Sequence, residues 1–215
     1  MIKADLHIHT EFSMDCTTPL DKIVERCLEL DISCIAIADH GTIEGALKLR
    51  EIAPFTVITA EEILTPNGEV MGMFLEESIP SGISVSEAIS EIRAQNGYIC
   101  VPHPFDIFRP SALGSKILDE IADQIDIIEV FNARTLPFKN QERANAFAEK
   151  YGKYKSAGSD AHTLKEIGNA YVEMPAFTNK DDFILSLAQG KVSGRKTNPM
   201  IHFVSLKNKI LKRLS

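Results

Sequence analysis

The chain has 215 residues, of which 44% are hydrophobic and 25% charged, an ordinary composition for a globular protein. A chain of this length predicts one domain over residues 1–215, since α/β barrels commonly reach this size as a single unit. Its net charge of -7 argues against a generally basic nucleic-acid-binding surface, although 23 Lys and Arg residues leave room for a local cationic groove.

Strand-like apolar runs alternate with helix-like segments almost from end to end. In chain order, the strand candidates are IKADLHIH, ISCIAIAD, FTVITAEEI, VMGMFL, YICVPHP, IDIIEVFN, YKSAGSD and AYVEMPA. Several are nearly continuous hydrophobic runs, as expected for parallel strands buried on both faces. Repeated strand–helix units of this kind predict an α/β fold with a parallel sheet, either doubly wound or closed into a barrel.

Helix signals lie between these strands. Thr18 predicts an N-cap and Pro19 the first helical position, while Ser84 and Glu87 predict a capping box. Apolar stripes within residues 117–125 and 144–151 indicate two further helices. No Gly-rich phosphate loop follows any strand, which counts against a nucleotide-cofactor fold.

The chain ends in a short basic tail, at about residues 200–215. Its cations are Lys207, Lys209, Lys212 and Arg213. We interpret the tail as a solvated helix end in preference to a contact for a partner or a nucleic acid.

Five of the six histidines lie at predicted strand ends beside carboxylates. The set, in chain order, is His7, His9, His40, Glu61 or Glu62, His103, Asp160 and His162. His7 and His9 alternate on the first strand, so their side chains point to the same face. Pro104 is expected to hold His103 in an extended conformation.

Each of these residues has a simpler explanation when taken alone. A strand-end histidine is more often hydrogen bonded than metal-bound, Asp39-His40-Gly41 is typical of a turn, and Asp160 suits a helix N-cap. However, the carboxyl ends of parallel strands converge on one mouth of an α/β fold. Burying so many ionisable groups there is costly unless metal ions pair them. The set as a whole therefore predicts a metal site.

Imidazole and carboxylate ligands without thiolates suit Zn²⁺, Mn²⁺ or Fe²⁺. The number of candidates exceeds the four ligands of one zinc, which predicts two or three ions. Such a centre polarises an oxygen, generates hydroxide near neutral pH and holds the attacking and leaving groups. Phosphoester hydrolysis uses all three effects, and amide or ring hydrolysis is possible with the same groups.

These motifs resemble those of the polymerase and histidinol phosphatase (PHP) family. ADLHIHTEFSMD resembles the first family motif, IADHGTIEGA the second, VITAEEI the third, VPHP the fourth and AGSDAH the last, in the right order over roughly residues 3–162. The resemblance implies a distorted seven-stranded, TIM-like (β/α)7 barrel with a two- or three-metal site at its C-terminal mouth.

The resemblance also implies the ligands of each metal. His7 and His9 would bind a first metal, and Glu62, which the family spacing favours over Glu61, would bridge to a second. The remaining ligands would be Asp160 for the first metal, His103 for the second, and Asp15, His40 and His162 for a third. The chain departs from the family where Asn132 and its neighbours supply no histidine after the sixth strand.

A metal-dependent phosphoesterase acting on a small phosphorylated metabolite, a nucleotide or a short oligonucleotide is the predicted function. Arg134 and Arg109 are the cations nearest in sequence to the predicted mouth, and they suit either phosphate contacts or ordinary surface ion pairs. The alternative is a metal-stabilised binding or regulatory module without turnover, which the completeness of the ligand set disfavours. Amide hydrolysis would require a carboxylated lysine or other strand motifs.

The sequence also bears on the compartment. Residues 1–10 lack the basic and long apolar regions of a signal peptide, and no apolar run approaches the length of a membrane span. The four cysteines have neither CxxC nor zinc-finger spacing, and Cys27 and Cys34 lie in apolar runs, which predicts buried thiols in a reducing compartment. We expect a cytoplasmic protein with no membrane association and no obligate protein partner.

Overall fold

A curved sheet forms the centre of the computed structural model, which describes residues 1–136, 139–201 and 212. Within these residues the sheet has nine strands in the order β7-β6-β5-β4-β3-β2-β1-β8-β9. The strands are β1 (Ile2–Ile8), β2 (Cys34–His40), β3 (Thr56–Thr65), β4 (Gly68–Met73), β5 (Tyr98–Val101), β6 (Ile127–Asn132), β7 (Tyr154–Gly158), β8 (Ala170–Met174) and β9 (Lys191–Gly194). Most of the predicted basic tail lies outside the described residues.

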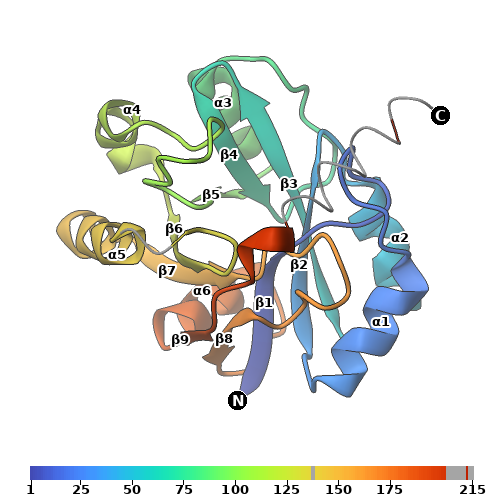
Figure 1. Ribbon diagram of the computed structural model, residues 1–215. Coiled ribbons are helices and arrows are strands. Elements are labelled where there is room, and N and C mark those ends of the chain that lie inside the picture. Colours follow the sequence, from blue (N-terminus) through green and yellow to red (C-terminus); the bar gives the residue numbers. More distant parts are fainter. Residues whose placement is uncertain (137–138, 202–211, 213–215) are drawn as a thin grey trace.

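The sheet curls until β7 comes beside β1, so that the barrel is nearly closed (Figure 1). The segment after β7 joins the two: Asp160 N donates to His7 O at 2.8 Å, and His9 N donates to Ala161 O at 3.0 Å. The predicted α/β barrel is thus confirmed. Its closing contacts are made by the same residues that carry the histidine motifs.

The expectation of a parallel sheet is wrong for two of the predicted strands, β4 and β8. β4 is antiparallel to β3 and β5, β8 is antiparallel to β1, and β9 is antiparallel to β8. Only Pro66 and Asn67 separate β3 from β4, and parallel strands need a crossover of a dozen or more residues. The short link therefore imposes a hairpin. The final strand, β9, has only four residues and was not predicted.

Six α-helices are described around the sheet: α1 (Leu20–Glu29), α2 (Glu44–Ile52), α3 (Val85–Ala94), α4 (Ser115–Glu120), α5 (Asn140–Tyr151) and α6 (Lys180–Ala188). Short 3₁₀ turns cover Ala122–Gln124 and Pro199–Ile201. The capping box of Ser84 and Glu87 opens α3 as predicted. The predicted Thr18 cap is wrong, because Pro19 occupies that position of α1 and the Thr18 hydroxyl donates to His162 O at 3.1 Å.

An apolar cluster fills the inner face of the sheet below the mouth. It draws on strands from β1 to β8, and it includes Ile58 and Ala60 of β3. Because side chains alternate along a strand, Glu62 lies on the same face as these two residues, at the end of the row. The same face of β3 is thus apolar in the middle of the barrel and polar at the mouth. The four cysteines are free and buried, as predicted for the two in apolar runs.

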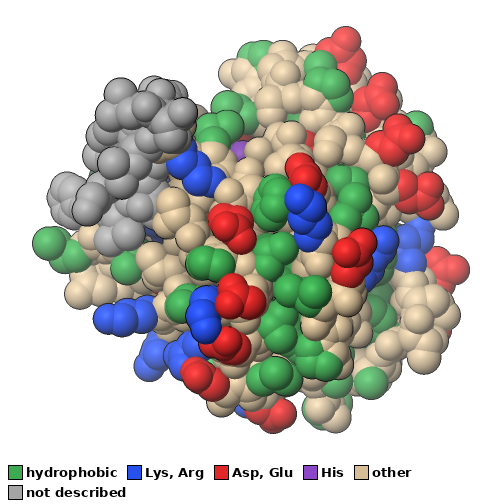
Figure 2. Space-filling view, turned by 90° about the vertical axis from the view of Figure 1, so that its right-hand side faces the viewer, with side chains coloured by type: hydrophobic (Ala, Val, Ile, Leu, Met, Phe, Trp, Pro, Cys, Tyr) green, Lys and Arg blue, Asp and Glu red, His purple; other side chains and the backbone are tan. Residues whose placement is uncertain are grey.

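Figure 2 shows the face of the molecule on which α1 and α2 lie. Acidic and basic side chains are interspersed there, and no continuous basic surface is visible. Among the described residues, no helix has both the length and the apolar character needed to span a bilayer.

Candidate metal centre

Glu62, at the mouth end of β3, lies at the centre of the histidine cluster. Its Oε2 lies 3.4 Å from Nε2 of both His7 and His9 and 3.6 Å from His40 Nδ1. Its other oxygen, Oε1, lies 2.7 Å from His103 Nε2. One fully buried carboxylate thus contacts histidines that come from three strand ends, and this is the position a bridging ligand requires.

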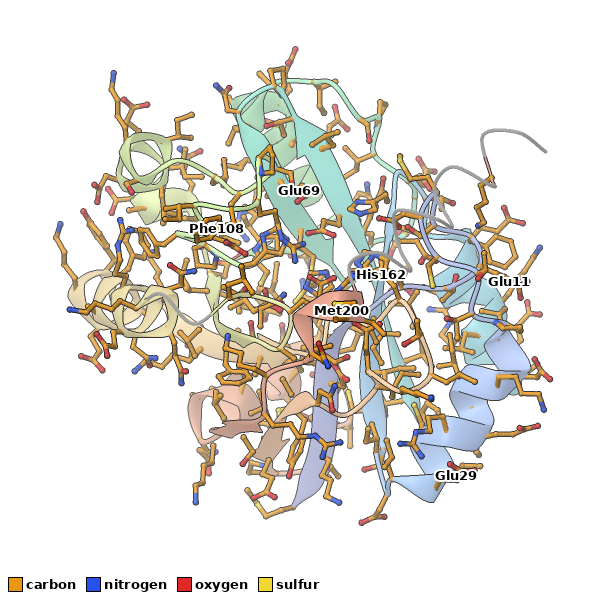
Figure 3. All side chains as sticks on the ribbon, viewed as in Figure 1. Glu11, Glu29, Glu69, Phe108, His162 and Met200 are labelled. Carbon is orange, nitrogen blue, oxygen red and sulfur yellow. The ribbon has the colours of Figure 1, made fainter. Side chains whose placement is uncertain are left out.

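Of the two nearby glutamates on β3 and β4, Glu69 points into the histidine cluster and Glu61 does not. Glu61 points away from the cluster and accepts a hydrogen bond from Ile79 N at 2.8 Å, so the structure brings Glu62 and not Glu61 into the centre. Glu69 of β4, which was not predicted, lies with Oε2 3.5 Å from His103 Nε2 and Oε1 3.9 Å from His40 Nδ1. Figure 3 labels Glu69 above the cluster. The sequence does carry a signal that could have identified Glu69, because an acidic residue within a buried strand needs a partner.

His7 and His9 converge as their alternation on β1 predicts. Their Nε2 atoms are 3.2 Å apart, and Asp160 Oδ1 lies 3.4 Å from His9 Nε2 and 3.9 Å from His7 Nε2. With Glu62, the two histidines place one ligand atom each within 4.8 Å of one another. This group has the donors and spacing to hold a metal ion.

A second group lies on the other side of His9. Asp15 Oδ2 is 3.2 Å from His162 Nε2 and 3.5 Å from His40 Nε2, and these three residues and His9 again fall within 4.8 Å. Figure 3 labels His162 beside the cluster. Burial raises the pKa of Asp15, but the hydrogen bonds and charges of His162 and His40 outweigh it and hold that pKa below its ordinary value. All eight predicted ligands therefore belong to one connected cluster.

The cluster carries an excess of carboxylates that calls for positive charge. Burial lowers the pKa of His40, yet Glu62 and Asp15 raise it to about 10, and carboxylates also raise the pKa of His7. Asp160 Oδ1 and Glu69 Oε2 are buried without a hydrogen-bond partner among the described residues. Divalent cations satisfy such acceptors and replace the protons on the histidines. The donor set therefore fits metal ions.

Two residues of the centre have left-handed backbone conformations. The φ angles are +31° at His103 and +53° at Asp160. The expectation that Pro104 keeps His103 extended is wrong, since His103 N is turned to donate to Glu129 Oε2 at 2.6 Å. Non-glycine residues in this region cost roughly 1–3 kcal/mol each and persist where their surroundings fix them, commonly at functional sites.

Glu129 and Asn132 of β6 support the centre and were not predicted to do so. Glu129 Oε1 lies 3.0 Å from His7 Nδ1, and its Oε2 accepts from Asn132 Nδ2 at 2.9 Å. Asn132 Nδ2 also lies 3.2 Å from Asp160 Oδ2. Asn132, where the resemblance would place a histidine, thus presents its amide N–H groups to carboxylates and orients them.

The two arginines occupy different positions. Arg109 donates from Nη2 to Asp160 Oδ2 at 2.6 Å, and its side chain is 19% exposed. Arg134 is 4% exposed, with Nη1 2.6 Å from His162 Nδ1 and Nε 3.2 Å from Glu166 Oε1. Neither is an ordinary surface ion pair, because each contacts a residue of the cluster.

Replacing Arg134 with Met is expected to lower the free energy of unfolding by about 3–5 kcal/mol, because the Glu166 carboxylate would remain buried without its cation. Chemical denaturation of the metal-free protein measures this difference. Arg50→Met, at an exposed site on α2, is the control. Equal stability of the two variants would show that the buried pair contributes nothing.

Two segments of the chain match models of known protein families. Residues 5–62 match the family model of the PHP domain, and residues 139–192 match that of a PHP-associated domain. An uncharacterized protein of Methanocaldococcus jannaschii is 35% identical over 175 residues, which cover 80% of this chain and 70% of that protein.

Two solved structures share the fold. One is a two-domain protein from Bacteroides vulgatus that contains a predicted PHP-like metal-dependent phosphoesterase, with a TM-score of 0.74 and 16% identity over 96% of this chain and 69% of that one. The other is PsfC from Pseudomonas syringae, with a TM-score of 0.68 and 16% identity over 99% and 98% of the two chains.

Proposed function

We propose that this chain, which belongs to the PHP domain family, is a hydrolase that cleaves a phosphate ester of a small metabolite, nucleotide or short oligonucleotide. One observation carries the proposal. Glu62 contacts His7, His9, His40 and His103 with its two oxygens, at the mouth of a barrel where all other predicted ligands also gather. A binding module without turnover would not need so complete a set.

We propose two or three divalent ions, of Zn²⁺, Mn²⁺ or Fe²⁺ type, as the cofactors. The groups that would hold them are His7, His9 and Glu62; His9, Asp15, His40 and His162; and His40, Glu62 and Glu69, with His103 and Asp160 beside them. Ions bound there supply Lewis acidity at a phosphoryl oxygen and activate water near neutral pH.

The arginines are proposed to divide two tasks. Arg109 is partly exposed and is held in place through Nη2 by Asp160, which leaves its guanidinium at the edge of the centre, where a phosphate group would approach. Arg134 is almost fully buried, and we propose that it positions His162 and neutralises the carboxylates behind it.

Small substrates are favoured over long nucleic acids by charge. The net charge is -7, and acidic and basic groups alternate on the face shown in Figure 2. Extended nucleic acids are bound mainly through clustered Lys and Arg. The four buried thiols support a reducing compartment, and we propose that the protein acts in the cytoplasm.

The test is hydrolysis by the full chain loaded with Mn²⁺ or Zn²⁺, using phosphomonoesters, 3′,5′-bisphosphates and short oligonucleotides. The His7→Ala and His9→Ala double variant is expected to lose both bound metal, measured by elemental analysis, and phosphate release. Activity that survived in this variant would refute the site. A metal-loaded native protein that releases no product from any substrate would favour the binding module.

A further inference from the structure

Asp15 differs from the other predicted ligands, because it lies in the middle of a loop and not within a few residues of a strand. This loop, residues 9–19, joins β1 to α1 and contains neither helix nor strand. Pairing within the sheet therefore does not place Asp15. Whatever holds the loop decides whether Asp15 Oδ2 reaches His162 Nε2 and His40 Nε2, from which it lies 3.2 Å and 3.5 Å away.

Asp39 of β2 anchors the start of this loop. Side chains alternate along the strand, so Asp39 shares the face of Ile37, which packs under α1 and α2, whereas His40 faces the centre. Asp39 Oδ1 accepts a hydrogen bond from Thr10 N and its Oδ2 accepts one from Thr10 Oγ1, both at 2.6 Å. Both residues are fully buried. A carboxylate in an apolar layer is costly unless it is paired, and Thr10 supplies the two donors.

Helix α2 comes so close to the Asp39–Thr10 pair that only glycine fits at position 45. A Cβ atom on Gly45 would lie 2.2 Å from Asp39 Oδ2 and 2.4 Å from Thr10 Oγ1. Gly45 belongs to the first turn of α2, where backbone N–H groups carry a partial positive charge that favours a nearby carboxylate. The pair is thus confined between the sheet and this helix.

Ser13 connects the anchored end of the loop to Asp15. Its N–H donates to Thr10 O at 3.0 Å. Its hydroxyl accepts a hydrogen bond from His40 N at 3.3 Å and donates one to Asp15 Oδ1 at 2.9 Å. Hydrogen bonds therefore run without a break from the Asp39–Thr10 pair to the carboxylate of Asp15.

We propose that Asp39 and Thr10 are positioning residues for one ion of the centre. This ion is the one that would be held by His9, Asp15, His40 and His162. The ligands on β1 and β3 are placed by the sheet itself, so the ion that they hold should stay when the loop is released. The loop thereby sets whether the centre carries its full number of ions. This inference rests on the metal centre of the proposed function, but not on which ester is cleaved.

Thr10→Val tests the anchor, because it removes the hydroxyl that donates to Asp39 and keeps the branched shape of the side chain. Competition with a chromophoric chelator measures Zn²⁺ binding to the full chain, and elemental analysis counts the ions. We expect one ion to bind about 10–100-fold more weakly, the usual effect of losing an outer-shell partner, and the others to bind as in the native protein. Thr10→Ser keeps the hydroxyl and is expected to restore the native titration.

Thr65→Val, on the β3–β4 hairpin, is the matched control. Thr65 is also buried, and its hydroxyl donates to Gly68 O at 2.6 Å and accepts from Asn67 N at 3.1 Å. Thr10 Oγ1 has the same pattern, with a carboxylate acceptor at 2.6 Å and Phe12 N as donor at 3.1 Å. We expect Thr65→Val to lower stability against chemical denaturation as Thr10→Val does, but to leave the Zn²⁺ titration unchanged. Equal effects of the two variants on the titration would contradict the proposal.

A double variant shows whether Thr10 acts through Asp15. Asp15→Asn alone should weaken the same ion, and adding Thr10→Val should then change the titration by less than about twofold, whereas independent effects would multiply. A further large loss in the double variant would overturn the proposal, as would a Thr10→Val protein that loses every ion together or none. Because the readout is ion binding, a native protein that binds ions and cleaves no ester refutes the proposed hydrolase, while the titration still decides the positioning role.

Discussion

Replacing Glu62 with Gln is expected to remove most of the bound metal and to lower phosphate release by at least about 100-fold, since losing even an outer-shell partner costs 10–100-fold. The Glu62 carboxylate contacts the imidazole nitrogens of four histidines with two oxygens. An amide offers one oxygen and no negative charge, so it cannot bridge. Metal content by elemental analysis and initial rates measure the two effects.

The adjacent residue provides a matched control. Glu61→Gln changes the same side chain on the same strand, but Glu61 lies on the opposite face, where its amide oxygen can still accept the hydrogen bond from Ile79 N. We expect metal content and activity near those of the native protein. If Glu61→Gln and Glu62→Gln behave alike, the bridging role of Glu62 is wrong.

The contrast between these neighbours shows what local pattern predicts. Alternation along a strand places His7 and His9 on one face and separates Glu61 from Glu62, because the period of two is a property of the backbone. Parity alone does not say which glutamate faces inward, and that choice came from the resemblance. The capping box at Ser84 is local in the same way. All of these signals lie within a few residues of each other.

Features that depend on distant pairing were not predicted. Glu129 stands within the apolar run of β6, and its partner His7 is 122 residues away. A buried carboxylate is costly unless it is paired, so Glu129 signals a partner without naming it. Thr18 shows the same limit, because its hydroxyl bonds to His162 O across the barrel closure and not to its own helix.

Replacing Glu129 with Gln is expected to weaken metal binding by about 10–100-fold, because Glu129 is the outer partner of His7. Its other neighbours, His103 N and Asn132 Nδ2, are also donors. Whichever way the glutamine amide is turned, its NH₂ group meets a donor. We also expect about 1–3 kcal/mol of lost stability from the unsatisfied group, which adds to the strain already present at His103.

Competition with a chelator measures the metal affinity of this variant, and chemical denaturation measures its stability. Glu173→Gln, on half-buried β8 away from the centre, serves as the control and should alter neither quantity. A Glu129→Gln protein that is destabilised but binds metal with native affinity would show that Glu129 acts on the fold alone. Native values for both would show that His7 and His103 are oriented by the strands themselves. The expected joint loss would mean that one carboxylate on β6 sets the geometry of two ligands from different strands.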